Sequence, residues 1–398
     1  MKKSLILAAL LMIAAFSFGQ SGRQPNVITT ATPFLSINPD SRGGAMGDCG
    51  VASSPDVFSM HYNAAKYAYL ENKLSIGLGY SPWLSALVKD MGLFYLAGAY
   101  KINDRSAVAA TIRYFNPGEI NFRDEHNIDQ GTYNPNEWAI DATYSRLLGD
   151  YLSGAVAARF IYSDLTQGQG NLGYERPGIS VAADVSVYYK RPVEWFKTVD
   201  ADFAWGVAIN NIGSKMNYNS SSDKRDFIPT TLRAGVSLGL ELDEYNSLAF
   251  NVDLSKLLVP TPPSYWPGTD SIRDGMDPNV AVVTGMIHSF YDAPGYGYNS
   301  DNEYVGNGPF LEELSEIMIG GGIEYWYNNI FSVRGGYFYE SPLKGNRQYV
   351  TLGAALRYNA FGLDVSYLIP TSRNVGAHPL ENTLRFNLIF CFGQKKKS

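Results

Sequence analysis

The sequence predicts an all-β fold: a transmembrane antiparallel β-barrel of about 14 strands, preceded by an N-terminal plug that a family resemblance described below implies. Three observations predict it: an export signal at the start of the chain, a two-residue alternation of apolar and polar side chains, and connections that are alternately short and long. We divide the chain accordingly. Residues 1–19 form the expected signal peptide, 20–72 a hatch or plug, 73–392 the barrel, and 393–398 a basic tail.

The first residues have the layout of a secretory signal peptide. Lys2 and Lys3 precede an apolar run from Leu5 to Phe16, and small residues precede Gln20. The run of about a dozen residues is shorter than the ~20 that a membrane-spanning helix needs, so a membrane anchor is the less favoured alternative. We therefore predict cleavage after residue 19 and export of the mature chain from the cytoplasm.

The composition agrees with a barrel and argues against other classes. After residue 20 no apolar run approaches ~18 residues, and the mean hydropathy is −0.15, so a bundle of membrane-spanning helices is excluded. The 28 Tyr, 20 Phe and 39 Gly suit the aromatic girdles and close interior packing of a barrel. A net charge of −6 argues against a nucleic-acid partner. Two cysteines among 398 residues cannot form a disulfide scaffold.

The alternation is clearest near the C-terminal end and recurs within 248–255 and 361–367. A period of two places alternate side chains on opposite faces of a strand, one suited to lipid and the other to a lumen. A two-layer sandwich would show the same alternation, so the number and length of the segments decide. In the last segment Leu384, Phe386, Leu388, Phe390 and Phe392 alternate with Thr383, Arg385, Asn387, Ile389 and Cys391.

Fourteen segments show strand character. Most are near the ~9–11 residues that a tilted transmembrane strand needs, whereas globular strands have a mode of about five or six. An even number lets both ends of the barrel lie on the same side of the membrane. The segments are 73–80, 91–101, 105–115, 136–147, 151–163, 178–190, 200–210, 230–241, 245–256, 315–326, 329–339, 347–358, 360–368 and 381–392.

The connections indicate an outer-membrane barrel, in which short turns face the periplasm and long loops face outward. The odd connections are mostly long, above all 257–314, so we expect the N-terminus to lie on the short-turn, periplasmic side. The sixth connection, from Arg191 to Val199, is longer than the pattern predicts. The tight even connections are Asn103-Asp104, Gly149-Asp150, Asp243-Glu244, Asn328-Asn329 and Asn359.

Residues 39–52 with Asn63-Ala64-Ala65 resemble the periplasmic hatch of FadL-like transporter barrels, in which glycines allow close backbone packing. A flexible linker is the alternative interpretation. A phosphate-binding loop is less favoured because no strand precedes the run and no Lys-Ser or Lys-Thr ends it. The residues that make up the predicted hatch motif are Asp40, Arg42, Gly44, Met46, Gly47, Asp48 and Asn63.

Further runs extend the resemblance to nearly the whole mature chain. They include Glu324-Tyr325-Trp326-Tyr327-Asn328-Asn329, Arg334-Gly335-Gly336-Tyr337-Phe338-Tyr339-Glu340, Lys344-Gly345-Asn346-Arg347 and Phe361-Gly362-Leu363-Asp364-Val365-Ser366-Tyr367. Together with the hatch they resemble the PorV (LptO) family, outer-membrane proteins of the type IX secretion system in Bacteroidetes. One departure is Ala64, where the family usually has proline, which bears on the local geometry of the hatch.

The resemblance implies a non-enzymatic secretion component without a cofactor. Such a protein binds the C-terminal signal domains of cargo at a SprA/Sov-type translocon barrel and passes cargo to attachment-complex proteins, in contact with outer-membrane lipid. Loop 257–314 carries Tyr265, Trp266, Phe290 and Tyr291, aromatic residues expected at a protein interface. In the alternative, these rings fold inward and close the barrel mouth.

A FadL-like transporter of hydrophobic small molecules is the alternative function. It would need a continuous apolar path, whereas the inward positions are polar and often charged, which favours a plugged or wet interior. Those positions are Arg233, Glu241, Asn251, Asp253, Asp364, Arg385 and Asn387.

Catalysis finds little support. The histidines His61, His126, His288 and His378 show no metal-ligand spacing, so we predict no metal site. A lipid deacylase, the remote alternative, would need a Ser-His-acid set built around His288-Ser289 or His378. Cys49 and Cys391 could form a disulfide in the periplasm, but two isolated thiols are favoured.

Overall fold

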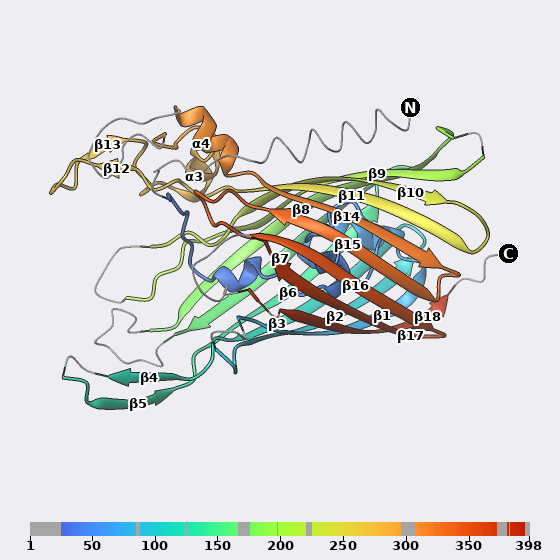
Figure 1. Cartoon of the computed structure of the whole chain (residues 1–398), viewed down its shortest axis with the longest axis horizontal. Coiled ribbons are helices and arrows are strands. Elements are labelled where there is room, and N and C mark those ends of the chain that lie inside the picture. Colours follow the sequence, from blue (N-terminus) through green and yellow to red (C-terminus); the bar gives the residue numbers. More distant parts are fainter. Residues whose placement is uncertain are drawn as a thin grey trace.

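The computed structural model describes residues 25–84, 88–123, 126–165, 176–196, 198–219, 225–295, 308–371, 380–381 and 383–394. The predicted signal peptide, residues 20–24 and His378 lie outside the described residues. In the described part of the chain, strands form a closed barrel, and the N-terminal segment lies inside it (Figure 1). No helix in this part is long and apolar enough to cross a membrane.

The predicted 14-stranded antiparallel barrel is confirmed. The last strand closes the barrel by pairing with the first, with Asn72 opposite Gln394 and Tyr80 opposite Phe386. The wall strands are β1 (Asn72–Pro82), β2 (Gly92–Asn103), β3 (Ser106–Asn116), β6 (Asn136–Leu147), β7 (Leu152–Asp164), β8 (Gly178–Val193), β9 (Asp200–Gly213), β10 (Thr231–Glu241), β11 (Asn246–Leu257), β14 (Met318–Tyr327), β15 (Phe331–Tyr339), β16 (Gln348–Tyr358), β17 (Phe361–Pro370) and β18 (Leu384–Gln394).

The two faces of the wall agree with the alternation in the sequence. On β18, Phe386 and Leu388 are exposed on the outside, while Arg385 and Asn387 are buried toward the lumen. On β11, Phe250 is exposed and its neighbour Asn251 is buried. An outer face of apolar side chains is what the hydrocarbon of a bilayer requires.

Short and long connections lie at opposite ends of the barrel, as expected. At the long-loop end, on the left of Figure 1, lie two small hairpins, β4 (Ile120–Arg123) with β5 (Asp129–Tyr133) and β12 (Ser264–Tyr265) with β13 (Ile272–Asp274). Two short helices, α3 (Val282–His288) and α4 (Pro309–Ser315), lie at the same end. The short turns join the strands at the other end.

Four predicted strand boundaries are wrong by three residues, among them the end of β9 at Gly213 and the start of β18 at Leu384. The sixth connection is shorter than expected, because β8 continues to Val193, which pairs with Ala201. The strand predicted to begin at residue 315 begins at Met318, because Pro309 starts helix α4, which ends at Ser315.

The N-terminal segment, residues 25–71, fills much of the lumen. It contains the turns η1 (Pro33–Ser36), α2 (Ser41–Gly44), η2 (Ser59–His61) and η3 (Ala64–Tyr69). We call this segment the plug. Its apolar side chains pack against small inward residues of the wall, and most of the plug is buried.

The path of the plug corrects one expectation. The backbone N–H of Asn26 donates to the carbonyl oxygen of Leu343 (2.9 Å), and its side chain donates to that of Pro262 (3.1 Å), both in long-loop connections. At the other extreme Lys101 donates to the carbonyl oxygen of Leu70 (2.6 Å), beside the short turns. Asn26 therefore lies at the long-loop end, not on the short-turn side, and the plug runs the height of the barrel. The even strand count predicts at which end of the barrel β1 begins. It does not predict the path of the residues that precede β1.

Candidate functional site

The glycine-rich run of the plug begins with a capped turn. The carboxylate of Asp40 accepts hydrogen bonds from the backbone N–H groups of Arg42 (2.9 Å) and Gly43 (2.8 Å), at the start of α2. Aspartate is favoured at this position because it satisfies N–H groups that have no partner within the helix. The cap holds the turn that carries Arg42.

Arg42 joins the plug to the wall. Its Nε and Nη2 donate to the two carboxylate oxygens of Glu324 on β14, at 2.9 and 2.5 Å, and its Nη1 donates to Asp56 at 3.2 Å. Glu324 also accepts from Arg334 on β15 (2.8 Å), which donates to Asp364 on β17 (2.8 Å). Bidentate arginine–carboxylate pairs combine strength with fixed geometry. We call the buried group Arg42, Glu324, Arg334 and Asp364 the plug latch.

Met46 and Gly47 lie where the wall has no side chains. A Cβ added at Gly322 on β14 would lie 2.4 Å from the backbone oxygen of Met46, and one at Gly336 on β15 would lie 2.2 Å from its carbonyl carbon. Gly47 has a φ of +68°, which side chains rarely adopt, and its N–H donates to Thr351 Oγ1 (2.9 Å). The plug backbone therefore rests directly on the wall.

Our sequence reasoning did not single out the glycines of β14 as contact residues. Gly320, Gly321 and Gly322 stand consecutively within a predicted strand, and glycine inside a strand often marks the close approach of another backbone. This signal could have located the surface on which the plug rests.

Asp48 and Gly44 contact another part of the wall. The Asp48 carboxylate accepts from Asn38 Nδ2 (2.7 Å) and from the hydroxyl of Tyr349 on β16, and it lies 3.5 Å from Arg385 Nη1 on β18. Gly44 leaves room for the same arginine, because a Cβ there would lie 2.4 Å from Nη1. The two residues thus fit the plug around one buried guanidinium.

Asn63 caps the last turn of the plug. Its Oδ1 accepts from the N–H of Ala65 (3.0 Å), and its Nδ2 donates to the carbonyl oxygens of Val51 (3.1 Å) and of Val187 on β8 (2.9 Å). Ala64 takes the first helical position, where an N–H needs no partner within the helix and proline or alanine both fit. Its departure from the family pattern leaves the cap intact. All seven predicted hatch residues thus lie inside the barrel.

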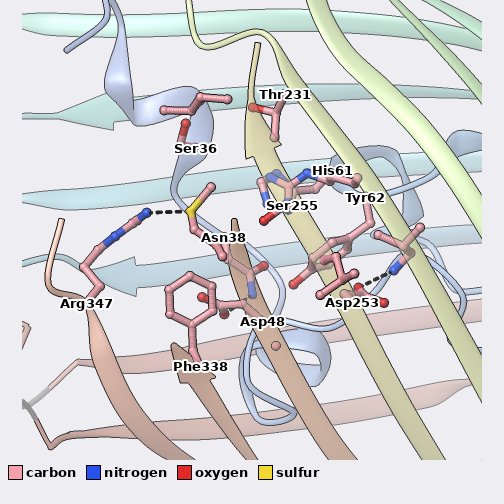
Figure 2. Close-up of a pocket in the computed structure, with 16 residues that line it drawn as sticks. Ser36, Asn38, Asp48, His61, Tyr62, Thr231, Asp253, Ser255, Phe338 and Arg347 are labelled. Atoms are coloured by element: carbon pink, nitrogen blue, oxygen red, sulfur yellow. Dashed lines mark hydrogen bonds between the residues drawn. The ribbon is translucent and has the colours of Figure 1, made fainter. Parts of the chain in front are cut away.

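A small cavity remains between the plug and the long-loop half of the wall (Figure 2). Its volume is about 70 Å³, whereas pockets for small-molecule ligands have roughly 300–1,000 Å³. Its lining includes the charged side chains of Asp48, Arg233, Asp253 and Arg347. Asp253 accepts a hydrogen bond from the backbone N–H of Val51 (2.9 Å), drawn as a dashed line in Figure 2. This cavity is too small for a hydrophobic ligand of ordinary size.

Helix α4 at the long-loop end has its carboxylates buried. Lys256 on β11 donates to Glu313 (3.0 Å) and also pairs with Glu316, and Lys344 donates to Glu312 (2.7 Å) and Glu316 (2.8 Å). Each lysine comes from a different part of the barrel, β11 or the connection between β15 and β16. The ion pairs hold the acidic side of the helix against the barrel mouth.

The other side of α4 is apolar and exposed. Glu312 is fully buried, whereas Phe310 is 72% exposed, and Leu311 and Leu314 are exposed as well. A water-soluble helix has the opposite arrangement, with its carboxylates in solvent and its apolar side chains packed. Exposed apolar surface of this kind is typical of interaction sites.

The predicted partner-contacting residues lie at the same end. Tyr265, Trp266, Phe290 and Tyr291 are each about half exposed, so these rings do not fold inward over the barrel mouth. Apart from Ile287, sequence reasoning missed the apolar side chains of the two helices, which could have been found from their three- and four-residue spacing. We call the full set the outer apolar residues: Tyr265, Trp266, Val283, Ile287, Phe290, Tyr291, Phe310, Leu311 and Leu314.

Asp292 follows α3 and packs beside the ion pairs of α4. Burial, together with the nearby carboxylates of Glu313 and Glu316, raises the pKa of Asp292 to about 6, against the opposing effect of a hydrogen bond from the N–H of Thr261 (3.3 Å). This carboxyl group therefore takes up its proton at a higher pH in the folded loop than an ordinary aspartate does.

Of the residues considered for catalysis, His288 and Ser289 lie in the described part of the chain and do not form a pair. The Ser289 hydroxyl donates to the carbonyl oxygen of Met286 (2.9 Å) rather than to His288, whose ring contacts Tyr291. Among the described residues, no group of three His, Cys, Asp or Glu side chains is placed to hold a metal ion. Cys49 in the plug and Cys391 on β18 are free thiols.

A closed barrel with an apolar outer face, alternating turns and loops, and a polar lumen filled by its own N-terminal segment defines a plugged outer-membrane β-barrel, located in the cell outer membrane. The family described as Type IX secretion system protein PorV matches residues 20–264. This match covers more than half of the chain, and the chain belongs to the PorV family.

Two solved structures of outer-membrane proteins are similar to this chain. The Pseudomonas putida toluene transporter TodX is 10% identical, with 92% of this chain and 98% of that chain covered and a TM-score of 0.48. A Pseudomonas aeruginosa FadL homologue is 11% identical, with 92% and 100% covered and a TM-score of 0.41. No curated protein matches the chain.

Proposed function

We propose that this barrel is the type IX secretion component that binds the C-terminal signal domains of cargo at the translocon and shuttles cargo to the surface attachment complex. Membership of the PorV family supports a role in this secretion system. The outer apolar residues are the surface on which we expect the cargo domain or a SprA/Sov-type translocon barrel to bind.

The reversed orientation of α4 carries the proposal. Three buried glutamates and two lysines hold the helix so that Phe310, Leu311 and Leu314 face outward. Burying carboxylates costs free energy unless each is paired, and exposing apolar side chains to water costs free energy as well, so each side of the helix needs its own compensating partner. The lysines supply it on the inner side. On the outer side, a protein surface that covers the apolar side chains would supply it.

The interior of the barrel supports binding over conduction. A transporter of hydrophobic molecules needs an apolar route, whereas the plug latch and the charged lining of the inner cavity place buried ion pairs across the lumen. We therefore propose that the protein acts by binding its partners at the long-loop end. Outer-membrane lipid surrounds the barrel.

The test replaces Tyr265, Trp266, Phe290 and Tyr291 with alanine. Loss of an aromatic anchor from an interface typically costs about 2 kcal/mol or more, so we expect partner recovery to fall at least tens of fold while the barrel still folds. Cargo on the cell surface and co-purification of the translocon would be measured together. Folding is checked by the change in gel migration that heating produces in an intact barrel. A second variant, with Phe310, Leu311 and Leu314 changed to serine, examines α4 itself.

The matched control changes four exposed aromatic residues near the short-turn end to alanine and should leave secretion unchanged. Normal surface cargo and wild-type partner recovery in both outer variants would contradict the proposal. The control residues are Tyr245, Tyr327, Phe331 and Tyr358.

A further inference from the structure

The short-turn end of the barrel opens into a second, much larger cavity. Its volume is about 1490 Å³, more than the roughly 300–1,000 Å³ of small-molecule pockets. It extends from the rim turns inward to the plug, where Arg42, Ser54 and Glu324 form part of its lining. We call this cavity the vestibule. Its size suits a segment of polymer better than a small ligand.

The lining of the vestibule is strongly acidic. Among the described residues that line it are ten carboxyl groups against four basic side chains. Four of the inner carboxylates are in ion pairs: Asp56 and Glu324 with Arg42, Asp364 with Arg357 (2.7 Å), and Asp202 with Lys190 (2.8 Å). The fifth, Asp40, accepts hydrogen bonds from backbone N–H groups of α2. The excess charge therefore lies near the rim.

Five rim carboxylates have no ion pair within the described chain, and all five are exposed. They come from the start of β1, from the turn between β6 and β7, from both sides of the β8–β9 turn and from the end of β10, so they are spread along an arc of the rim. A concave surface lined by one sign of charge focuses its field and attracts ligands of the opposite sign. These carboxylates are Glu71, Asp150, Glu194, Asp200 and Glu241.

The spacing of these carboxylates indicates which kind of cationic ligand they suit. No three carboxylates in the described part of the chain are close enough to hold a metal ion, so the charge suits a ligand with several separated positive groups. Deeper in the vestibule, Asn251 is 3% exposed, and its Oδ1 accepts no hydrogen bond from the described residues. Near the rim, the buried Oδ1 of Asn72 likewise has no donor, and the ring of Tyr151 is about half exposed. Acceptor oxygens and an open aromatic face match ammonium and guanidinium groups.

We propose that the vestibule is a binding site for a lysine- and arginine-rich segment of a polypeptide that enters from the short-turn side. The segment lies along the arc of rim carboxylates and reaches inward toward Asn251. This site is separate from the outer apolar residues, which lie at the opposite end of the barrel, and its test does not depend on cargo binding there.

The test uses the intact barrel in lipid nanodiscs, which leave both ends open, and a fluorescein-labelled octalysine peptide as probe. Fluorescence anisotropy should show binding at about 50 mM salt that weakens markedly at about 300 mM, because salt screens exposed charges. An octaglutamate peptide should not bind. Changing the five rim carboxylates to their amides should weaken octalysine binding by about tenfold or more, a factor of ten being about 1.4 kcal/mol.

A matched variant controls for total charge and for folding. It removes five exposed carboxylates at the long-loop end, Glu119, Asp129, Asp270, Asp277 and Glu381, and should bind octalysine within about twofold of the wild type.

A photoreactive group on the probe should cross-link to residues 190–202 and 239–249. Equal weakening by both variants, cross-links confined to the outer loops, or no binding at low salt would each overturn the proposal. Heat-modifiable migration of both variants shows that the barrel is folded.

Discussion

Replacing Arg42 with methionine removes the plug side of the latch and keeps much of the side-chain volume. The substitution takes away both hydrogen bonds to Glu324, at 2.9 and 2.5 Å, and the pair with Asp56 at 3.2 Å. Among the described residues, Glu324 then keeps Arg334 alone as a partner. The wall strands lose none of their pairing, so the barrel should form while the plug is held less firmly.

The magnitude follows from the burial of the pair. Removing one partner of a buried ion pair costs about 3–5 kcal/mol. Because Arg42 and Glu324 also line the vestibule, solvent screens the charge left behind, and we take the lower value, about 3 kcal/mol. That free energy corresponds to roughly a hundredfold increase in the population with a displaced plug.

Planar-bilayer conductance of the purified barrel measures this population directly. The open fraction should rise about a hundredfold in Arg42→Met and comparably in Glu324→Gln. Combining the two substitutions should add little, because both remove the same pair. Arg105→Met, at an exposed turn residue, is the matched control. Wild-type conductance in a folded Arg42→Met barrel, or fully additive effects, would refute the role of the latch.

Three further predictions concern the wall, the orientation and the outer loop. Phe250→Arg should prevent assembly of a heat-modifiable barrel, since a cation facing lipid costs ~2–4 kcal/mol, whereas the inward Ser237→Ala should not; equal loss would contradict the assignment of faces. A tag within 276–280 should be labelled on intact cells, and one at 243–244 only after the outer membrane is opened; the reverse labelling would invert the topology. Because folding raises the pKa of Asp292 to about 6, its stabilising contribution is complete below about pH 4 and is lost as the pH rises through 6. Proteolysis of the outer loop should therefore be slower at about pH 5 than at about pH 7.5, and a wild-type pH response in Asp292→Asn would disprove this cause.

The wall could be predicted from the sequence because its determinants are local. The alternation that assigns Phe250 to lipid and Asn251 to the lumen is contained within a few residues, and it places nearly every strand within three residues of its observed bounds. The start of β14 was misplaced because Pro309 begins a helix whose orientation depends on distant lysines.

The plug was harder to predict because its contacts are distant in sequence. Arg42 and Glu324 are 282 residues apart, and Asn26 and Leu343 are separated even further. The motif around Gly47 indicated close packing, yet the surface on which it packs is defined by the absence of side chains at Gly322 and Gly336. The family resemblance located the hatch, and only the structure shows that Asn26 reaches the long-loop end.

Helix α4 shows why the function of the outer end cannot be predicted from periodicity alone. Its sequence contains an acidic side and an apolar side, and the ordinary expectation places the acidic side in water. Lys256 and Lys344, from separate parts of the barrel, reverse that expectation by pairing with Glu312, Glu313 and Glu316. Replacing such buried ion pairs with apolar residues is often neutral or stabilising, so stability alone does not require them. The pairs instead fix which side of the helix faces outward, and an outward apolar side is useful to a barrel whose task is to hold another protein at its mouth.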